Sequence, residues 1–481
     1  MSFSRVQVTV AIENSLAKIE EIVKSRIDSK ATPGIVAALF YEGEVLWFRG
    51  AGSREVGGPA PEDSTAFRIA SCTKSFTAAA TLLLRDRGLL SLDDPITKYM
   101  PGYQHAGPLA HSAPPTLRML LTMSAGFGTD DPWADREESI SACELERHVS
   151  NGIYLISAPG TRYEYSNLGY ALVGRVIEIV SGQSFPQFVT DQIFAPLALN
   201  DSSFSVAASQ SPNVAIGYRR RGEEWLAQDF SGPGSFSSIG GAFSSARDLA
   251  RWANWLAQSL NPDSPESGPL SLATRREMQQ LHIPMPFSND AATTPETRGR
   301  LFGYGFALHV DIDENYGKFV SHSGGYPGYS AHMRWHENSR VGVVVLENAR
   351  YSGAWATATR ILESVVSELP QPATPRLSSI LDNYIARASS LILNWTDELA
   401  DEICAPNVAL DIPYDERSLE IAAMLDQVGN LRKVNEFETE VDESALHARW
   451  LIPGEKESLL CELRLTPVLP LKIQTLRVSI R

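Results

Sequence analysis

The sequence predicts an α+β protein in which helices flank an antiparallel sheet and an all-helical lobe lies beside it. Strand-like segments form two groups, at residues 34–52 and 318–348, and the long region between them is mainly helical in pattern. Such distant groups can join one sheet when the intervening helices pack beside it. A proline-rich stretch then sets apart a shorter C-terminal region that has its own helix and strand patterns.

The N-terminal region has the pattern of a helix followed by a hairpin. Residues 11–28 carry apolar side chains at helical spacing, which are Ile12, Leu16, Ile19, Ile22 and Val23. The runs GIVAALFY and VLWFRGAG, joined by the turn EGE, predict two paired strands within residues 34–52. Later in the chain, KFVSHSG, SAHMRW and GVVVLEN predict three further strands, and residues 352–369 predict a helix after them.

Three prolines mark an expected domain boundary. Pro370, Pro372 and Pro375 lie close together, and proline opposes both helix and strand pairing, so residues 370–376 are expected to be a linker. A main domain of residues 1–369 would precede it. Residues 377–481 are expected to form a small α+β domain with helices to about residue 428 and an antiparallel sheet after them. Its expected task is structural, within an oligomer or over a cleft.

Composition limits the possible partners and compartment. The chain has 481 residues, of which 43% are hydrophobic, and a formal net charge of −15. Nucleic acid and anionic membranes need a basic surface, so neither is expected as a partner. Neither a signal peptide nor a span of roughly 20 apolar residues is recognised, so a cytoplasmic location is expected. Free, buried thiols would suit that compartment, and the cysteines are Cys72, Cys143, Cys404 and Cys461.

The stretch ASCTKSFT pairs a serine with a lysine one helical turn later. Ser71 and Lys74 open a segment whose apolar face predicts a helix that stops near Gly88. A serine hydroxyl needs an adjacent base to become a good nucleophile, and a lysine can serve when burial lowers its pKa. The spacing alone is weak evidence. Ser15 and Lys18 share it within a charge-rich, solvated helix, where a structural role is expected.

Two further segments carry reactive groups. In EYSNLGY, Tyr165 lies in a loop before a helix, where its phenol could shuttle a proton, and Asn167 could hold a substrate amide or carbonyl. In VSHSGGYPGY, His322 ends a strand, and Gly324 and Gly325 would let a substrate lie against the backbone. A glycine N–H group, with that of the serine, could form an oxyanion hole. Taken singly, such a tyrosine or histidine is more often structural.

In this order, the segments resemble the three signatures of the serine β-lactamase/penicillin-binding-protein-like hydrolases, in the branch of class C β-lactamases, family VIII esterases and D-aminopeptidases. TLRMLLTMSAGF, PGTRYEYSNLGYALVGRVIE and GGAFSSARDLARW also look like family segments, and the likeness runs from about residue 10 to 368. It implies that Ser71 is acylated, that Lys74 activates it and that Tyr165 transfers protons. It further implies an oxyanion hole from the N–H groups of Ser71 and Gly325, and no metal or organic cofactor.

His322 departs from the family pattern. Many members have a lysine at this position, whose permanent charge suits a substrate carboxylate, whereas a histidine is largely neutral near pH 7. The departure favours small esters, amides or short peptides with an N-terminal D-residue. D-Ala-D-Ala carboxypeptidase or β-lactamase activity is an alternative, and so is a catalytically inactive binding or regulatory module.

Acidic and aromatic residues near the motifs leave the substrate open. An aminopeptidase would need carboxylates near the acyl group to hold an ammonium. Solvated-loop and helix-capping roles are nevertheless favoured for the nearby acids, which are Asp130, Asp131 and Glu164. The aromatic residues that could line an apolar pocket, or equally belong to the core, are Trp133, Tyr326 and Tyr329.

Overall fold

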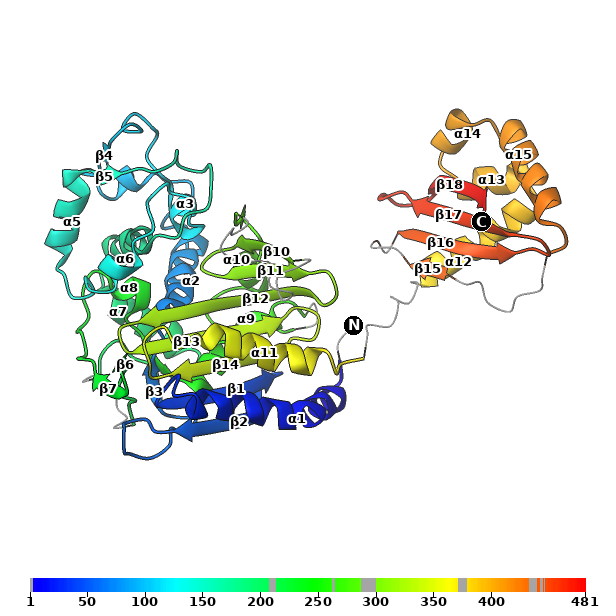
Figure 1. Ribbon diagram of the computed structural model, residues 1–481. Coiled ribbons are helices and arrows are strands. Elements are labelled where there is room, and N and C mark those ends of the chain that lie inside the picture. The colour runs from blue at the N-terminus through cyan, green and yellow to red at the C-terminus, as the bar shows by residue number, and fades with distance from the viewer. Residues whose placement is uncertain are drawn as a thin grey trace. The chain divides into compact units, whose positions relative to one another are not determined.

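The computed structural model describes residues 3–206, 213–261, 264–286, 300–370, 379–431, 439–441, 444 and 446–481. The chain divides between Leu369 and Pro370 into two compact units, which are drawn in Figure 1. The expected linker lies outside the described residues from position 371 onward. Within the described ranges, no helix is long and apolar enough to cross a membrane.

An eight-stranded antiparallel sheet forms the centre of the N-terminal unit, in the order β2-β1-β14-β13-β12-β11-β10-β9 (Figure 1). Two strands from the start of the chain thus lie beside strands from its later part, which confirms that the two predicted strand groups share one sheet. The strands are β1 (Gly34–Tyr41), β2 (Glu44–Gly52), β9 (Ile283–Pro284), β10 (Arg300–Tyr304), β11 (His309–Asp313), β12 (Gly317–Tyr326), β13 (Tyr329–His336) and β14 (Gly342–Glu347).

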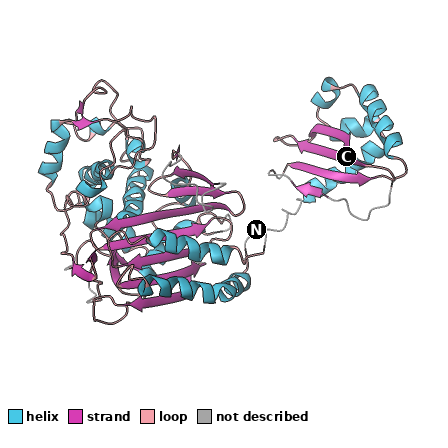
Figure 2. Cartoon of the chain, viewed as in Figure 1, coloured by secondary structure: helices cyan, strands magenta, loops and turns pink. Residues whose placement is uncertain are grey.

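Strand β1 is apolar at every position after its first glycine because helices cover both faces of the sheet. Val36 and Phe40 belong to one hydrophobic core, and Ile35 and Leu39 belong to the other. Alternate residues of a strand point to opposite faces, so a strand buried on both sides reads as a continuous apolar run. Figure 2 shows helices against the magenta sheet.

One face of the sheet is covered by α1 (Arg5–Asp28) and α11 (Ala354–Val366). Helix α1 begins earlier than the predicted residue 11, because Ser4 and Gln7 form a capping box at its start. The other face packs against a mainly helical lobe, which also contains short two-stranded pairs.

The elements of this lobe position the candidate site. They are β3 (Ala66–Arg68), η1 (Ala70–Cys72), α2 (Thr73–Asp86), η2 (Ile96–Lys98), β4 (His105–Ala106), α3 (Leu117–Leu121), α4 (Asp131–Ala134), α5 (Ala142–Asn151), β5 (Ile153–Tyr154), α6 (Asn167–Ser181), α7 (Phe185–Val189), η3 (Thr190–Phe194), β6 (Tyr218–Arg221), β7 (Glu224–Ala227), α8 (Ser237–Gly240), β8 (Phe243–Ser245), α9 (Ala246–Gln258) and α10 (Leu272–Met278).

The C-terminal unit has its own core and is α+β. Its elements are α12 (Ser379–Leu393), α13 (Asp397–Ile403), α14 (Asn407–Asp411), α15 (Tyr414–Val428), β15 (Thr439–Val441), β16 (His447–Pro453), β17 (Ser458–Leu465) and β18 (Ile473–Ile480). The four strands form one antiparallel sheet in sequence order. Helices α12 and α13 are separate, because Thr396 caps a new helix start.

Candidate active site

A cavity of about 350 Å³ lies where strand β12 passes the start of helix α2. The pairing of β11 with β12 ends at Ser321, while the pairing of β12 with β13 continues to Tyr326. The end of β12 therefore lines the cavity along its unpaired side. Of the residues singled out in the sequence, those that line the cavity are Ser71, Asp131, Tyr165, His322, Gly324 and Gly325.

The segment before the serine is tightly held. Ala70 has a φ of +48°, a left-handed conformation that is uncommon for a residue with a side chain. A Cβ atom on Gly324 would lie 2.2 Å from the carbonyl oxygen of Ile69. Only glycine lets β12 come this close, so the strand fixes the position of Ser71 from one side.

Lys74 lies at the centre of the site and is fully buried. Its Nζ lies 3.0 Å from Ser71 Oγ, 2.6 Å from Asn167 Oδ1 and 2.8 Å from the carbonyl oxygen of Ile239. Burial lowers the pKa of Lys74 from 10.5 to about 8, although nearby carboxylates oppose this effect. A lysine with such a pKa can accept a proton near neutral pH.

The three partners of Lys74 suit both of its protonation states. A protonated amine has three hydrogens and donates one to each oxygen. A neutral amine donates to Asn167 and Ile239 and turns its lone pair to the Ser71 hydroxyl, which then donates. A proton can therefore pass from Ser71 to Lys74 without a loss of hydrogen bonds.

Tyr165 stays protonated beside this pair. Burial raises its pKa well above 10, and the negative charge of Asp131 raises it further, although a hydrogen bond with Ser71 opposes the shift. The Nζ atom of Lys74 lies 5.1 Å from the centre of the Tyr165 ring. The phenol is thus placed to pass protons rather than to act as a phenolate base.

Asn167 lies behind Lys74 and not in the cavity. Its Oδ1 accepts from Lys74, its Nδ2 donates to Asp130 and Asp131, and only 1% of the residue is exposed. Both ends of the amide are therefore used within the protein. The predicted contact with a substrate is replaced by a positioning contact with the lysine.

His322 is an uncharged part of the cavity wall. Its Nδ1 lies 2.6 Å from the Ser323 carbonyl oxygen and its Nε2 lies 3.0 Å from Tyr304 Oη. A carbonyl only accepts, so Nδ1 carries the proton and Nε2 accepts from the tyrosine. Burial lowers the pKa of His322 well below 6.5, and His309 and Lys74 lower it further. It therefore places no positive charge in the cavity near pH 7.

The three acids near the motifs have different surroundings. Asp130 caps helix α6 by accepting from the backbone N–H groups of Asn167 and Leu168. Glu164 accepts from Thr129 on an exposed surface. These two fit the interpretation from sequence, whereas Asp131 does not, because it lines the cavity.

For other residues, the structure decides between roles that the sequence left open or corrects the sequence interpretation. Tyr326 and Tyr329 are buried core residues, and their hydroxyls donate to Glu138 and Ala215. Cys143 is exposed rather than buried. The cavity residues that the motifs did not reveal include His309, Ser323, Ser330, Tyr351 and Trp355. Of these, His309, Tyr351 and Trp355 come from segments that the fold alone brings to the serine, whereas Ser323 lies within VSHSGGYPGY and Ser330 directly follows it.

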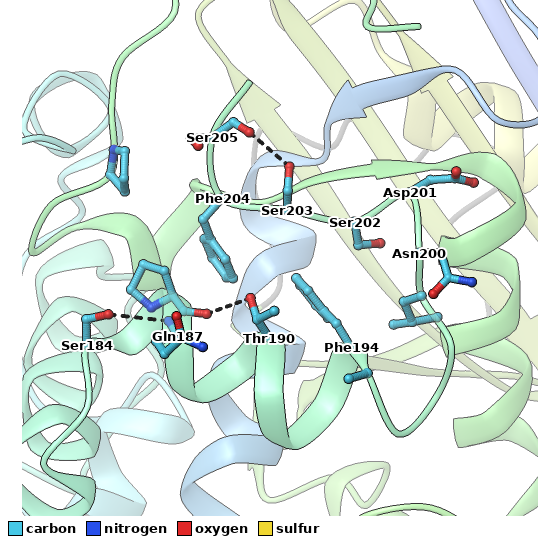
Figure 3. Close-up of a pocket in the computed structure, with 14 residues that line it drawn as sticks. Ser184, Gln187, Thr190, Phe194, Asn200, Asp201, Ser202, Ser203, Phe204 and Ser205 are labelled. Carbon is cyan, nitrogen blue, oxygen red and sulfur yellow. Dashed lines mark hydrogen bonds between the residues drawn. The ribbon is translucent and has the colours of Figure 1, made fainter. Parts of the chain in front are cut away.

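A second cavity of about 530 Å³ lies between η3 and the loop at residues 199–205 (Figure 3). Phe194 and Phe204 stack across it with ring centres 5.6 Å apart. Its labelled hydroxyls make local bonds, such as Thr190 Oγ1 to the Pro186 carbonyl and Ser203 Oγ to the Ser205 carbonyl. The smaller cavity is the better candidate active site, because it holds a nucleophile beside a base.

Comparisons with known proteins agree on one family. The sequence model of the family described as Beta-lactamase matches residues 19–366. Protein flp of Staphylococcus aureus (strain NCTC 8325 / PS 47) is 26% identical over 345 residues, which are 70% of this chain and 63% of that protein. Penicillin-binding protein 4* of Bacillus subtilis (strain 168) is 24% identical over 330 residues, which are 64% of this chain and 66% of that protein. The chain thus spans less than two thirds of each relative's length.

Two solved structures share the fold. The octameric penicillin-binding protein homologue from Pyrococcus abyssi has a TM-score of 0.62 and 21% identity, over 97% of this chain and 100% of that one. EstCE1, a hydrolase with promiscuous acyltransferase activity, has a TM-score of 0.60 and 21% identity, over 73% of this chain and 99% of that one.

Proposed function

The chain belongs to the β-lactamase family, a family of serine hydrolases, and on this premise we propose that it acts through an acyl-enzyme at Ser71 on small esters or amides. The observation that carries the proposal is the contact of 3.0 Å between Ser71 Oγ and the buried amine of Lys74. The pKa of this lysine is lowered to about 8, so a useful fraction is neutral near pH 7.

The proposed reaction has two steps. Ser71 Oγ attacks the substrate carbonyl while its proton moves to Lys74. As the carbonyl–leaving-group bond breaks, Lys74 passes that proton to Tyr165, which at the same time gives its own proton to the leaving alcohol or amine. Water then attacks the acyl ester, its proton follows the reverse route, and Ser71 is released. The N–H groups of Ser71 and Gly325 are proposed to bind the oxyanion. The N-terminus of α2 supports the negative charge that develops there.

The wall of the cavity bears on the choice of substrate. Among its described lining residues there is no lysine or arginine, and His322 is neutral. A substrate carboxylate therefore lacks a counter-ion, which disfavours β-lactams and cell-wall peptides. Esters and amides without a carboxylate near the reacting bond fit better.

The test compares kcat/KM for p-nitrophenyl butyrate and D-alanine p-nitroanilide in the wild type and in Ser71→Ala. We expect turnover of at least one substrate, with a loss of about a thousandfold or more in Ser71→Ala. Mass spectrometry of the ester reaction should show an acyl group on the peptide that contains Ser71. Equal turnover in both proteins would reject the nucleophile, and no turnover in either would favour an inactive binding module.

We also propose that the chain forms a homo-oligomer in the cytoplasm. The Pyrococcus abyssi homologue is described as octameric, and its similarity extends over the C-terminal unit. Light scattering of the full chain should then give a mass that is a multiple of 52.7 kDa. A mass of a single chain at micromolar concentration would contradict this part of the proposal.

A further inference from the structure

The cavity around Ser71 carries a carboxylate without a basic partner. Asp131 lines the cavity, and its Oδ1 accepts from Asn167 Nδ2 at 2.6 Å. Across the described ranges, no lysine or arginine side chain forms an ion pair with Asp131. The charge of Asp131 acts on Lys74, but the amine of Lys74 forms its hydrogen bonds with three other oxygens.

A serine hydroxyl without a hydrogen-bond partner lies in the same cavity. Ser330 is only 4% exposed and lines the cavity, and its hydroxyl has no hydrogen bond to any described residue. Ser330 on β13 pairs with Gly325 on β12, so the two residues face the same side of the sheet. The ring of Tyr351 lies on that side, because a Cβ atom on Gly325 would contact it. Because Ser330 lines the cavity, this hydroxyl is available to a ligand.

Two exposed aromatic side chains complete the wall. Tyr351 and Trp355 line the cavity and are 47% and 59% exposed. The Tyr351 hydroxyl donates to Asp135, which holds its ring in place. Aromatic faces attract ammonium groups, and carboxylates form ion pairs with ammonium groups. Acid, hydroxyl and aromatic groups together suit a cation.

We propose that this cavity selects ester or amide substrates that carry an ammonium group, with Asp131 as its counter-ion and Ser330 as a further hydrogen-bond acceptor. This inference rests on the proposed function, because it concerns the same site. It also differs from a simpler role for Asp131, in which the carboxylate only stabilises the charged form of Lys74. The simpler role would affect charged and neutral substrates equally.

The kinetic test uses two substrates of nearly equal size. Both enantiomers of alanine p-nitroanilide are compared with isobutyric p-nitroanilide, in which a methyl group replaces the ammonium, at pH 7. We expect kcat/KM of the wild type to favour one alanine enantiomer by about tenfold or more, as for a hydrogen bond to a charged group. Asp131→Asn should remove this preference, since it keeps the bond from Asn167 but not the charge. Glu164→Gln is the matched control and should keep the preference.

The results separate the two roles of Asp131. If Asp131→Asn slows the charged and neutral anilides by the same factor, or if the wild type shows no preference, the inference is rejected. Ser330→Ala should reduce the preference by a smaller factor, about threefold. It provides a second variant if Asp131→Asn does not fold.

A binding test keeps the inference separate from the proposed mechanism. Calorimetry with the Ser71→Ala chain compares alaninamide with isobutyramide, neither of which needs to be hydrolysed. Tighter binding of alaninamide, by about tenfold, supports the inference even if Ser71 proves not to be the nucleophile. Equal or weaker binding of alaninamide rejects it, whatever the outcome of the kinetic test of Ser71.

Discussion

The chain contains the same Ser-x-x-Lys spacing in two helical segments with opposite surroundings. In α1, Ser15 is buried and donates to the Ser364 carbonyl at 2.9 Å, while Lys18 is exposed to solvent. At the start of α2, Lys74 is the fully buried member, and Ser71 faces a cavity. The serine is thus the buried residue in the first copy, whereas the lysine is the buried residue in the second.

This reversal explains why one copy can react and the other cannot. In α1 the serine hydroxyl already donates to a backbone carbonyl, and the lysine is exposed to solvent. A lysine in a dry, hydrogen-bonded site holds its proton more weakly and stays in contact with one hydroxyl. The spacing only brings two groups to one side of a helix, and burial then decides their chemistry.

The largest difference between the copies should appear when each lysine is removed. Lys74→Met keeps the length of the side chain but leaves Ser71 without a base, so kcat/KM for p-nitrophenyl butyrate should fall by about a thousandfold. Lys18→Met should leave kcat/KM within about twofold. Circular dichroism of both variants serves as a check on folding. Comparable losses of kcat/KM in the two variants would contradict the conclusion that only the copy in α2 is reactive.

The second prediction removes the close approach of β12 to the serine segment. Gly324→Ala would place a Cβ atom 2.2 Å from the Ile69 carbonyl oxygen, so the segment before Ser71 has to move. We expect kcat/KM to fall by about a hundredfold and the free energy of unfolding to fall by about 1–3 kcal/mol.

Gly232→Ala is the matched control for this change, because a Cβ atom there would meet nothing within 4 Å. Denaturant titration and kinetics of the two variants measure the difference. If Gly324→Ala keeps full activity, strand β12 does not position the nucleophile.

The third prediction concerns pH. The pKa of Lys74 is lowered from 10.5 to about 8, and the neutral form is the base, so kcat/KM should rise about tenfold from pH 7 to pH 9 and then level off. The folded lysine also binds fewer protons than the unfolded one between these two pKa values. The free energy of unfolding should therefore gain a contribution that grows with pH from about 8 to 10.5.

The pH profile of Lys74→Met is the control, and it should lack the inflection near pH 8. The inflection near pH 8 cannot come from Tyr165, because its pKa lies well above 10. A profile that is flat between pH 7 and pH 9 in the wild type would mean that the lysine is not the titrating base.

Much of the fold could be predicted because some strands are apolar along their whole length. Strand β1 contacts a core on both faces, so its sequence pattern is strong. Strands β10 and β11 were not predicted, since their buried polar groups depend on partners elsewhere. Asp311 on β11 is buried, and Arg334 on β13 donates two hydrogen bonds to it. A short sequence window with such acids looks like a loop.

The candidate site could be predicted only in part, because some of its residues have a local sequence pattern and others depend on distant contacts. Ser71 and Tyr165 belong to segments with recognisable signatures, and both line the cavity. The direction of an amide cannot be predicted from sequence, so Asn167 was expected at the substrate and lies behind Lys74. Asp131 and Ser330 have no local pattern at all. They reach the cavity only through the packing of α4 and the pairing of β13.

The smallest expected effect belongs to the serine of the structural copy. Ser15→Ala removes a buried hydrogen bond to the Ser364 carbonyl, which also accepts from Ser367 Oγ at 2.9 Å and so keeps a partner. The free energy of unfolding should fall by about 1 kcal/mol, as measured by denaturant titration, with kcat/KM unchanged. Since Ser71→Ala should have the reverse profile, the pair of variants separates a stabilising serine from a reactive one. A loss of activity in Ser15→Ala without a loss of stability would show that the reversal of burial does not distinguish the two copies.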